Sequence, residues 1–87
     1  MADLTLYGRG YCHLCDDMKL ALEPLQGEFT FTLHEVDVDS DPAIEERLGE
    51  LVPVLMTGTP ANPGRELCHY FADLPGIRAW LADPASA

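Results

Sequence analysis

Hydrophobic and polar residues alternate along two stretches of the chain, and this period of two predicts β-strands. Residues 3–7 read Asp-Leu-Thr-Leu-Tyr, and residues 29–38 combine the same alternation with aromatic and β-branched residues, which favour strands. An apolar run at residues 51–56 contains Pro53, so we expect that strand to begin at or after the proline. A fourth strand is expected at residues 65–70, after a segment rich in proline and glycine.

The first helix is predicted from apolar residues that recur every three or four positions after the first strand. It begins near His13 or Leu14. We expect Pro24 and Gly27 to end it, because proline disrupts a helix interior and glycine favours helix ends. Its apolar face is formed by Leu14, Met18, Ala21, Leu22 and Leu25.

The second and third helices are predicted mainly from their start signals. Asp41 has a side chain that caps helices, and Pro42 suits the first helical position; this short helix is expected to stop at Gly49. Asp73 is expected to cap a last helix that extends to Leu81.

The predicted order of elements is therefore β-α-β-α-β-β-α, an α/β fold. The first βαβ unit should give parallel strands with a right-handed crossover. The short turn at residues 57–64 should give an antiparallel hairpin, so the sheet is expected to be small and mixed, with helices packed on it. A chain of 87 residues without an internal repeat or linker predicts a single domain over residues 1–87.

The charge of the chain restricts the classes of partner that we expect. There are 5 basic and 15 acidic residues, which give a formal net charge of −10. Nucleic acid and anionic membranes would repel such a chain, so partners should be neutral or basic where they touch it. No secretory signal and no apolar run of ~18 residues is visible, which favours the cytoplasm. In that compartment the three cysteines are expected to be reduced, catalytic or metal-binding.

Cys12 and Cys15 are the residues that point most directly to a chemical function. They lie three positions apart, between the first predicted strand and the first predicted helix. At the first turn of a helix this spacing lets the two sulfurs meet, and the unpaired N–H groups there favour a thiolate on Cys12. The thiolate is the nucleophile of disulfide exchange, and Arg9 would favour it too. Cys15, one turn further in, should be more buried and resolve the mixed disulfide.

This arrangement resembles the thioredoxin fold. The resemblance rests on the first strand, on the Cys-x-x-Cys that opens the first helix, and on Val52-Pro53 before the third strand. The length of the chain is similar to that of the short bacterial glutaredoxin-like proteins. The resemblance implies a four-stranded mixed sheet with three helices and a thiol–disulfide oxidoreductase, with Cys12 attacking and Cys15 resolving. It implies no bound cofactor, glutathione as a co-substrate, and a monomer that acts on a disulfide-bearing protein or on glutathione.

The resemblance also implies substrate-binding residues. Pro53 matches the cis-proline of the family, and Val52 matches the residue whose backbone pairs with a bound thiol peptide. Arg9 stands where many glutaredoxins carry a lysine, and Asp73 lies near the position that meets the γ-glutamyl end of glutathione. Tyr11 is expected either to cover the disulfide or contact a partner, or to be a simple loop aromatic.

The chain departs from the pattern of the family at two places. The pair between the cysteines is His13-Leu14, where a protonated His13 would favour the thiolate of Cys12 and a neutral one would be a surface residue. The paired glycines that precede the last helix in glutaredoxins are replaced by Tyr70-Phe71-Ala72. Cys68 lies in a predicted strand and is expected to be a small buried hydrophobic residue.

Two other functions stay open for the cysteine pair. Two thiolates from each of two chains would hold zinc or an iron–sulfur cluster, with the second chain or glutathione completing the site. A binding module that kept the fold without turnover is the other alternative.

Overall fold

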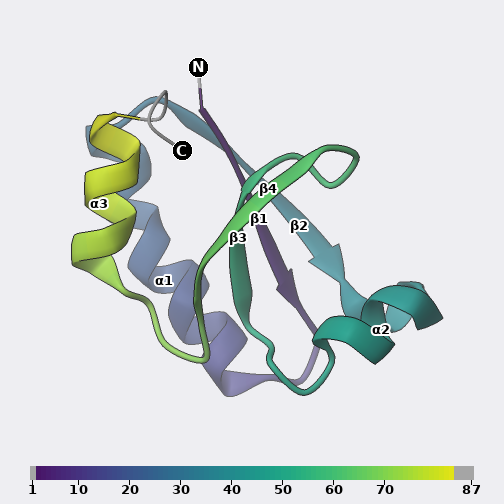
Figure 1. Ribbon diagram of the computed structural model, residues 1–87. Helices are drawn as coiled ribbons and strands as arrows, with labels where there is room; N and C mark the ends of the chain where they lie inside the picture. The colour runs from purple at the N-terminus through teal and green to yellow at the C-terminus, as the bar shows by residue number, and fades with distance from the viewer. Residues whose placement is uncertain (1, 84–87) are drawn as a thin grey trace.

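The structure is a computed structural model that describes residues 2–83. The predicted order β-α-β-α-β-β-α is confirmed, with one additional 3-10 turn, η1, between β2 and α2 (Figure 1). The elements are β1 (Ala2–Gly8), α1 (His13–Glu28), β2 (Phe31–Asp37), η1 (Val38–Ser40), α2 (Pro42–Leu48), β3 (Val54–Gly58), β4 (Pro63–His69) and α3 (Leu74–Ala82).

The four strands form one mixed sheet in the order β2-β1-β3-β4. β1 pairs with β2 in parallel, whereas β3 is antiparallel to both β1 and β4. The βαβ unit and the antiparallel hairpin are thus both present as predicted. The register places Tyr7, near the end of β1, opposite Val54 at the start of β3. The loops that follow β1 and precede β3 therefore meet at the same end of the sheet.

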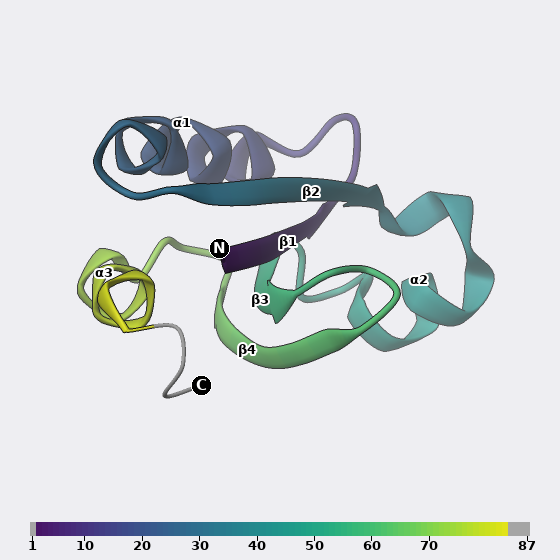
Figure 2. The same cartoon turned by 90° about the horizontal axis from the view of Figure 1, so that it is seen from above.

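The helices cover both faces of the sheet. Helices α1 and α3 lie together on one side, and α2 lies on the other (Figure 2). The larger core cluster joins the sheet to α1 and α3 through Leu4, Leu22 and Trp80. A smaller cluster around Val38 and Val54 contacts the half-buried apolar residues of α2. Each face of the sheet therefore has its own apolar layer.

The predicted end of the first helix is wrong, because α1 continues through Pro24 to Glu28. Leu22 and Leu25 are both buried, on either side of the proline in sequence, whereas Pro24 itself is exposed. A proline in a helix interior costs ~3 kcal/mol. Burial of Leu25, the leucine beyond the proline, is worth ~1.5–3 kcal/mol and offsets most of that cost.

Several predicted strand limits are also shifted. β2 is shorter than the predicted strand at residues 29–38, because it starts at Phe31 and Val38 belongs to η1. β3 extends to Gly58 and β4 begins at Pro63, so the hairpin loop is shorter than the predicted turn. Gly58 has a φ of 89°, a left-handed conformation that glycine adopts without steric cost.

The predicted helix starts are confirmed. Asp41 accepts a hydrogen bond from the backbone N–H of Ala43 at 2.9 Å, and Asp73 accepts one from Gly76 at 3.2 Å. Across residues 2–83, no helix is both long and apolar enough to cross a membrane.

Candidate active site

Cys12 and Cys15 form a disulfide at the start of α1, with their Cα atoms 5.1 Å apart. Cys12 is the N-cap of this helix: its backbone is extended, and its sulfur accepts a hydrogen bond from the N–H of Cys15 at 3.1 Å. The first N–H groups of a helix have no partner within the helix, and they carry partial positive charge. The local geometry therefore stabilises negative charge on the Cys12 sulfur.

The two cysteines differ in their access to solvent. Cys15 is 6% exposed, whereas Cys12 is partly exposed. A Cβ atom at Gly8, the last residue of β1, would lie 3.1 Å from the sulfur of Cys15. Glycine at this position thus leaves room for the buried sulfur at the end of the strand. Of the two cysteines, Cys12 is the one that a partner reaches more easily.

The start of β3 lies next to this end of β1. Since Val54 is opposite Tyr7, Pro53 is placed beside Gly8. The Val52–Pro53 peptide bond is cis, and Pro53 is buried. The structure therefore brings Val52 and Pro53 to the same end of the sheet as the dithiol.

Tyr70, in the connection between β4 and α3, joins this neighbourhood. Its backbone N–H donates to the carbonyl of Pro53 at 2.9 Å, and its hydroxyl donates to the carbonyl of Glu50 at 3.0 Å. Its φ of 64° lies in the left-handed region, which a bulky side chain rarely adopts. Tyr70 was not among the predicted site residues. The signal for it was its place where glutaredoxins carry paired glycines, which adopt such conformations readily.

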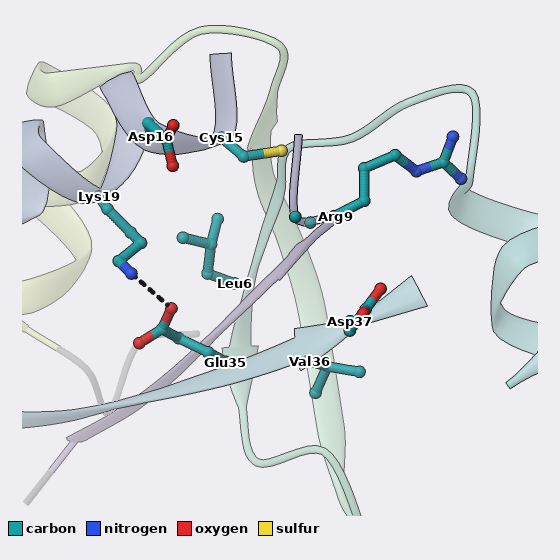
Figure 3. Close-up of a pocket in the computed structure, with 10 residues that line it drawn as sticks. Leu6, Arg9, Cys15, Asp16, Lys19, Glu35, Val36 and Asp37 are labelled. Atoms are coloured by element: carbon teal, nitrogen blue, oxygen red, sulfur yellow. Dashed lines mark ion pairs between the residues drawn. The ribbon is translucent and has the colours of Figure 1, made fainter. Parts of the chain in front are cut away.

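Arg9 is directed away from the dithiol. Its guanidinium lies 3.3 Å from a carboxylate oxygen of Asp39 and 3.9 Å from one of Glu45. Figure 3 shows its side chain extending away from Cys15. The structure therefore does not bring the Arg9 head group to Cys12, where sequence reasoning placed it.

The remaining predicted residues occupy different parts of the surface. Tyr11 is 83% exposed, so it covers little of the disulfide and is available to a partner. His13 is exposed in the first turn of α1. Asp73 caps α3, in the connection that also contains Tyr70. Tyr11 and Asp73 thus come from two different loops, one before α1 and one before α3.

A cavity of about 380 Å³ opens on the other side of Cys15, between α1 and β2. Lys19 and Glu35 form an ion pair across it, with 3.0 Å between nitrogen and oxygen (Figure 3). This hydrogen bond raises the pKa of the Lys19 ammonium above its ordinary value. Cys15 lines the cavity and Cys12 does not, so the cavity lies behind the disulfide and away from its exposed sulfur.

Cys68 lies outside the site, on β4. It is half-buried opposite Leu55 and packs against the main core, as expected for a small hydrophobic residue. Burial raises the pKa of its thiol. Among residues 2–83, no group of three or more His, Cys, Asp or Glu side chains is placed to hold a metal ion.

Comparison with known families identifies the chain. The model of the glutaredoxin-like domain family (DUF836) matches residues 3–82. The chain belongs to the glutaredoxin-like domain family. Its sequence has no significant match among curated proteins.

Two solved structures share enough sequence with this glutaredoxin-like chain to support the assignment. The solution structure of Ne2328 from Nitrosomonas europaea is 36% identical, with a TM-score of 0.78, over 92% of this chain and 91% of that one. The crystal structure of XcR50 from X. campestris is 43% identical, with a TM-score of 0.66, over 91% of this chain and 95% of that one.

More distant structures establish the fold. Thioredoxin from Trypanosoma brucei brucei is 17% identical, with a TM-score of 0.70, over 100% of this chain and 77% of that one. Oxidised thioredoxin O1 from Arabidopsis thaliana is 16% identical, with a TM-score of 0.62, over 94% of this chain and 76% of that one. The glutaredoxin-like chain therefore has the thioredoxin fold, and its Cys12–Cys15 pair is consistent with redox activity.

Proposed function

We propose that this glutaredoxin-like protein is a thiol–disulfide oxidoreductase that works through two thiols. The observation that carries the proposal is the asymmetry of the cysteine pair: the Cys12 sulfur caps α1 and is partly exposed, whereas Cys15 is 6% exposed. A helix start favours the thiolate, and the thiolate is the attacking species. Cys12 is thus suited to attack and Cys15 to resolve.

The reaction begins with the reduced protein. The Cys12 thiolate attacks one sulfur of a substrate disulfide; a Cys12–substrate bond forms, the substrate S–S bond breaks, and the leaving sulfur takes a proton. Cys15 then loses its proton and attacks the sulfur of Cys12, which releases the second substrate thiol. The substrate gains two electrons from the protein and two protons, one lost by Cys15 and one taken from solvent, and the protein is left with the Cys12–Cys15 disulfide. A thiol reductant, such as a dithiol or two glutathione molecules, restores the reduced protein.

The residues around the pair are assigned roles in holding the substrate. We assign the Val52 backbone to pair with an extended peptide that carries the reacting cysteine, since Pro53 beside it has no N–H to compete. Tyr11 and Asp73 are assigned to contact the rest of the substrate. Arg9 is assigned a structural role instead, because its charge is engaged by Asp39 and Glu45.

The proposal includes the setting of the protein. The chemistry uses only the two sulfurs, so we propose no resident cofactor, and a monomer suffices because both cysteines come from one chain. Thiol reductants keep cytoplasmic cysteines reduced, and we propose that compartment as the place of action.

A turnover assay tests the function. Purified protein is given a disulfide peptide and excess dithiothreitol, and release of peptide thiol is followed above the uncatalysed rate. Wild type should accelerate the reaction, Cys12→Ser should abolish the acceleration, and Cys68→Ser should retain it as the matched cysteine control. No acceleration by wild type, or a full rate in Cys12→Ser, would refute the proposal. The metal content of the purified proteins tests the alternative. If the wild type contains zinc or iron and Cys12→Ser does not, the metal site is favoured instead.

A further inference from the structure

We propose that this site takes polypeptide disulfides whose cysteines are flanked by apolar and basic residues, in preference to glutathione disulfide. The inference rests on the proposed redox function and names the class of its substrate. It follows from three features of the surface around Cys12: exposed apolar side chains, a rigid connection that carries them, and a one-sided distribution of charge.

Exposed apolar side chains gather beside the dithiol. Across residues 2–83, four of the five large hydrophobic side chains that are exposed belong to the loop before Cys12, to the connection from β4 to α3, or to the first residue of α3. We call these four the apolar rim. Phe71, at 69% exposed, and Tyr11, at 83%, contribute most of its open surface. The members of the apolar rim are Tyr11, Tyr70, Phe71 and Leu74.

The two segments of the apolar rim lie at the same end of the sheet. Tyr11 precedes Cys12 directly. Tyr70 is bonded to Pro53, and the strand register places Pro53 beside Gly8, which abuts the sulfur of Cys15. In Figure 1 the connection between β4 and α3 and the start of α1 both lie at the lower end of the sheet. A side chain next to a cysteine that reacts with Cys12 would therefore contact the apolar rim.

Within the apolar rim, Tyr70 is held in a fixed conformation. Tyr70 adopts a left-handed φ of 64°, which is uncommon for a bulky residue. Two hydrogen bonds keep it there, from its N–H to Pro53 and from its hydroxyl to Glu50. Because the connection is already ordered, a bound side chain would lose less affinity to ordering the site.

The charges around the opening favour a basic partner. Residues 10–15, 49–54 and 69–76 contain no lysine or arginine, but they contain the carboxylates of Glu50 and Asp73. Arg9 is the nearest cation in sequence to Cys12, and Asp39 and Glu45 engage it. The other basic residues lie on helices and on β4. Lys19 is paired with Glu35, and Arg78 is paired with Glu28. Arg47 lies on α2 and Arg65 on β4.

Glutathione disulfide fits this surface poorly. Each tripeptide carries two carboxylates and no apolar side chain, so it would bring negative charge to an acidic border and leave the apolar rim uncovered. A lysine or arginine beside the reacting cysteine would instead be attracted, and a phenylalanine or leucine would bury apolar surface. The discrimination therefore has both an attractive and a repulsive component.

The test uses three disulfides of defined chemistry: glutathione disulfide and the homodimeric disulfides of capped Lys-Cys-Phe and capped Glu-Cys-Ser. Reduced protein is mixed with each disulfide, the reaction is quenched by acid and alkylation, and formation of the Cys12–Cys15 disulfide is read from the intact mass. Each rate is divided by the rate of the same disulfide with dithiothreitol, which removes differences in intrinsic reactivity. We expect Lys-Cys-Phe to react about tenfold faster than the other two, as burial of one apolar side chain and an added charge attraction would give.

Two variants locate the preference. Phe71→Ser should lower the ratio of the Lys-Cys-Phe rate to the glutathione rate about fivefold, because it removes the most exposed side chain of the connection. Phe71→Lys should lower the ratio further by attracting glutathione carboxylates. Leu20→Ser is the matched control: Leu20 is 61% exposed on α1 outside the apolar rim, so its substitution should leave the ratio unchanged.

Several outcomes would overturn the inference. Equal normalised rates, a faster rate with glutathione disulfide, or an unchanged ratio in Phe71→Ser would each do so. Size-exclusion chromatography provides a further outcome. If the wild type is a dimer and Phe71→Ser is a monomer, the apolar rim binds a second copy of the chain instead of a substrate. If no disulfide oxidises the reduced wild type, the proposed function itself fails, and that result is distinct from oxidation without preference.

Discussion

Replacing Gly8 with alanine should destabilise the protein, because the new methyl group would press on the buried sulfur of the active site. A Cβ atom there would lie 3.1 Å from the sulfur of Cys15 and 3.3 Å from its Cβ. Favourable contact between heavy atoms begins at roughly 3.5 Å. Cys15 is 6% exposed and tied to Cys12, so it has little freedom to move aside.

The expected size of this effect follows from two opposing contributions. Overpacking of a well-packed site costs ~1–3 kcal/mol. Alanine in place of glycine in a strand recovers ~0.5–1 kcal/mol of backbone entropy. The free energy of unfolding should therefore fall by about 1 kcal/mol, which lowers the Tm of a domain of this size by ~4–8 °C. Reduction releases the side chain of Cys15 from Cys12, so the difference from wild type should become smaller in the reduced protein.

Gly27→Ala is the matched control, since it makes the same chemical change on α1 with nothing within 4 Å of the new Cβ. It should raise the free energy of unfolding by ~0.5–1 kcal/mol. Urea denaturation of oxidised and reduced protein, followed by the fluorescence of buried Trp80, measures all of these differences. If Gly8→Ala is as stable as wild type in the oxidised form, the close approach of β1 to Cys15 is not a constraint, and the reasoning is refuted.

Three further changes have definite expected outcomes. Pro24→Ala should raise the free energy of unfolding by at least ~1 kcal/mol in a urea titration, because Pro24 is exposed within α1 and the substitution relieves an interior proline; a loss of stability would contradict this. Asp73→Ala should lower the Tm by ~4–8 °C, since it removes a helix cap worth ~1 kcal/mol, whereas Asp73→Asn should retain most of the stability. Burial raises the pKa of the Cys68 thiol, so less thiolate exists at a given pH; alkylation of Cys68 in the oxidised protein should be slow at pH 7 and still accelerate above pH ~9.5, where an ordinary thiol is almost fully ionised and its rate levels off. A plateau at or below that pH would contradict it.

Much of the fold was predictable because its signals are local. The caps Asp41 and Asp73, the alternation in β1 and the Cys-x-x-Cys spacing each depend on residues a few positions apart. The end of α1 was not predictable in this way. Pro24 gives a local signal to stop, but Leu25 beyond it is buried against the sheet and α3, and that contact depends on residues far along the chain.

The candidate site was predictable in its sulfur chemistry and less so in its surroundings. Cys12 and Cys15 follow from their spacing at a helix start. The pairing of Arg9 with Asp39 and Glu45 depends on where η1 and α2 pack, which no spacing in the sequence gives. Tyr70 was visible only as a departure from paired glycines; its hydrogen bonds to Pro53 and Glu50 required the assembled sheet.

The roles of Cys12 and Cys15 are separated by comparing two variants with one cysteine each. Cys15→Ser/Cys68→Ser keeps only Cys12, and Cys12→Ser/Cys68→Ser keeps only Cys15. Each is mixed with the same peptide disulfide, and the mixed disulfide is followed by intact mass at neutral pH. We expect rapid formation of the adduct on Cys12 and slow formation on Cys15, whose side chain is buried. An adduct that forms as fast or faster on Cys15 would contradict the assignment of Cys12 as the attacking residue.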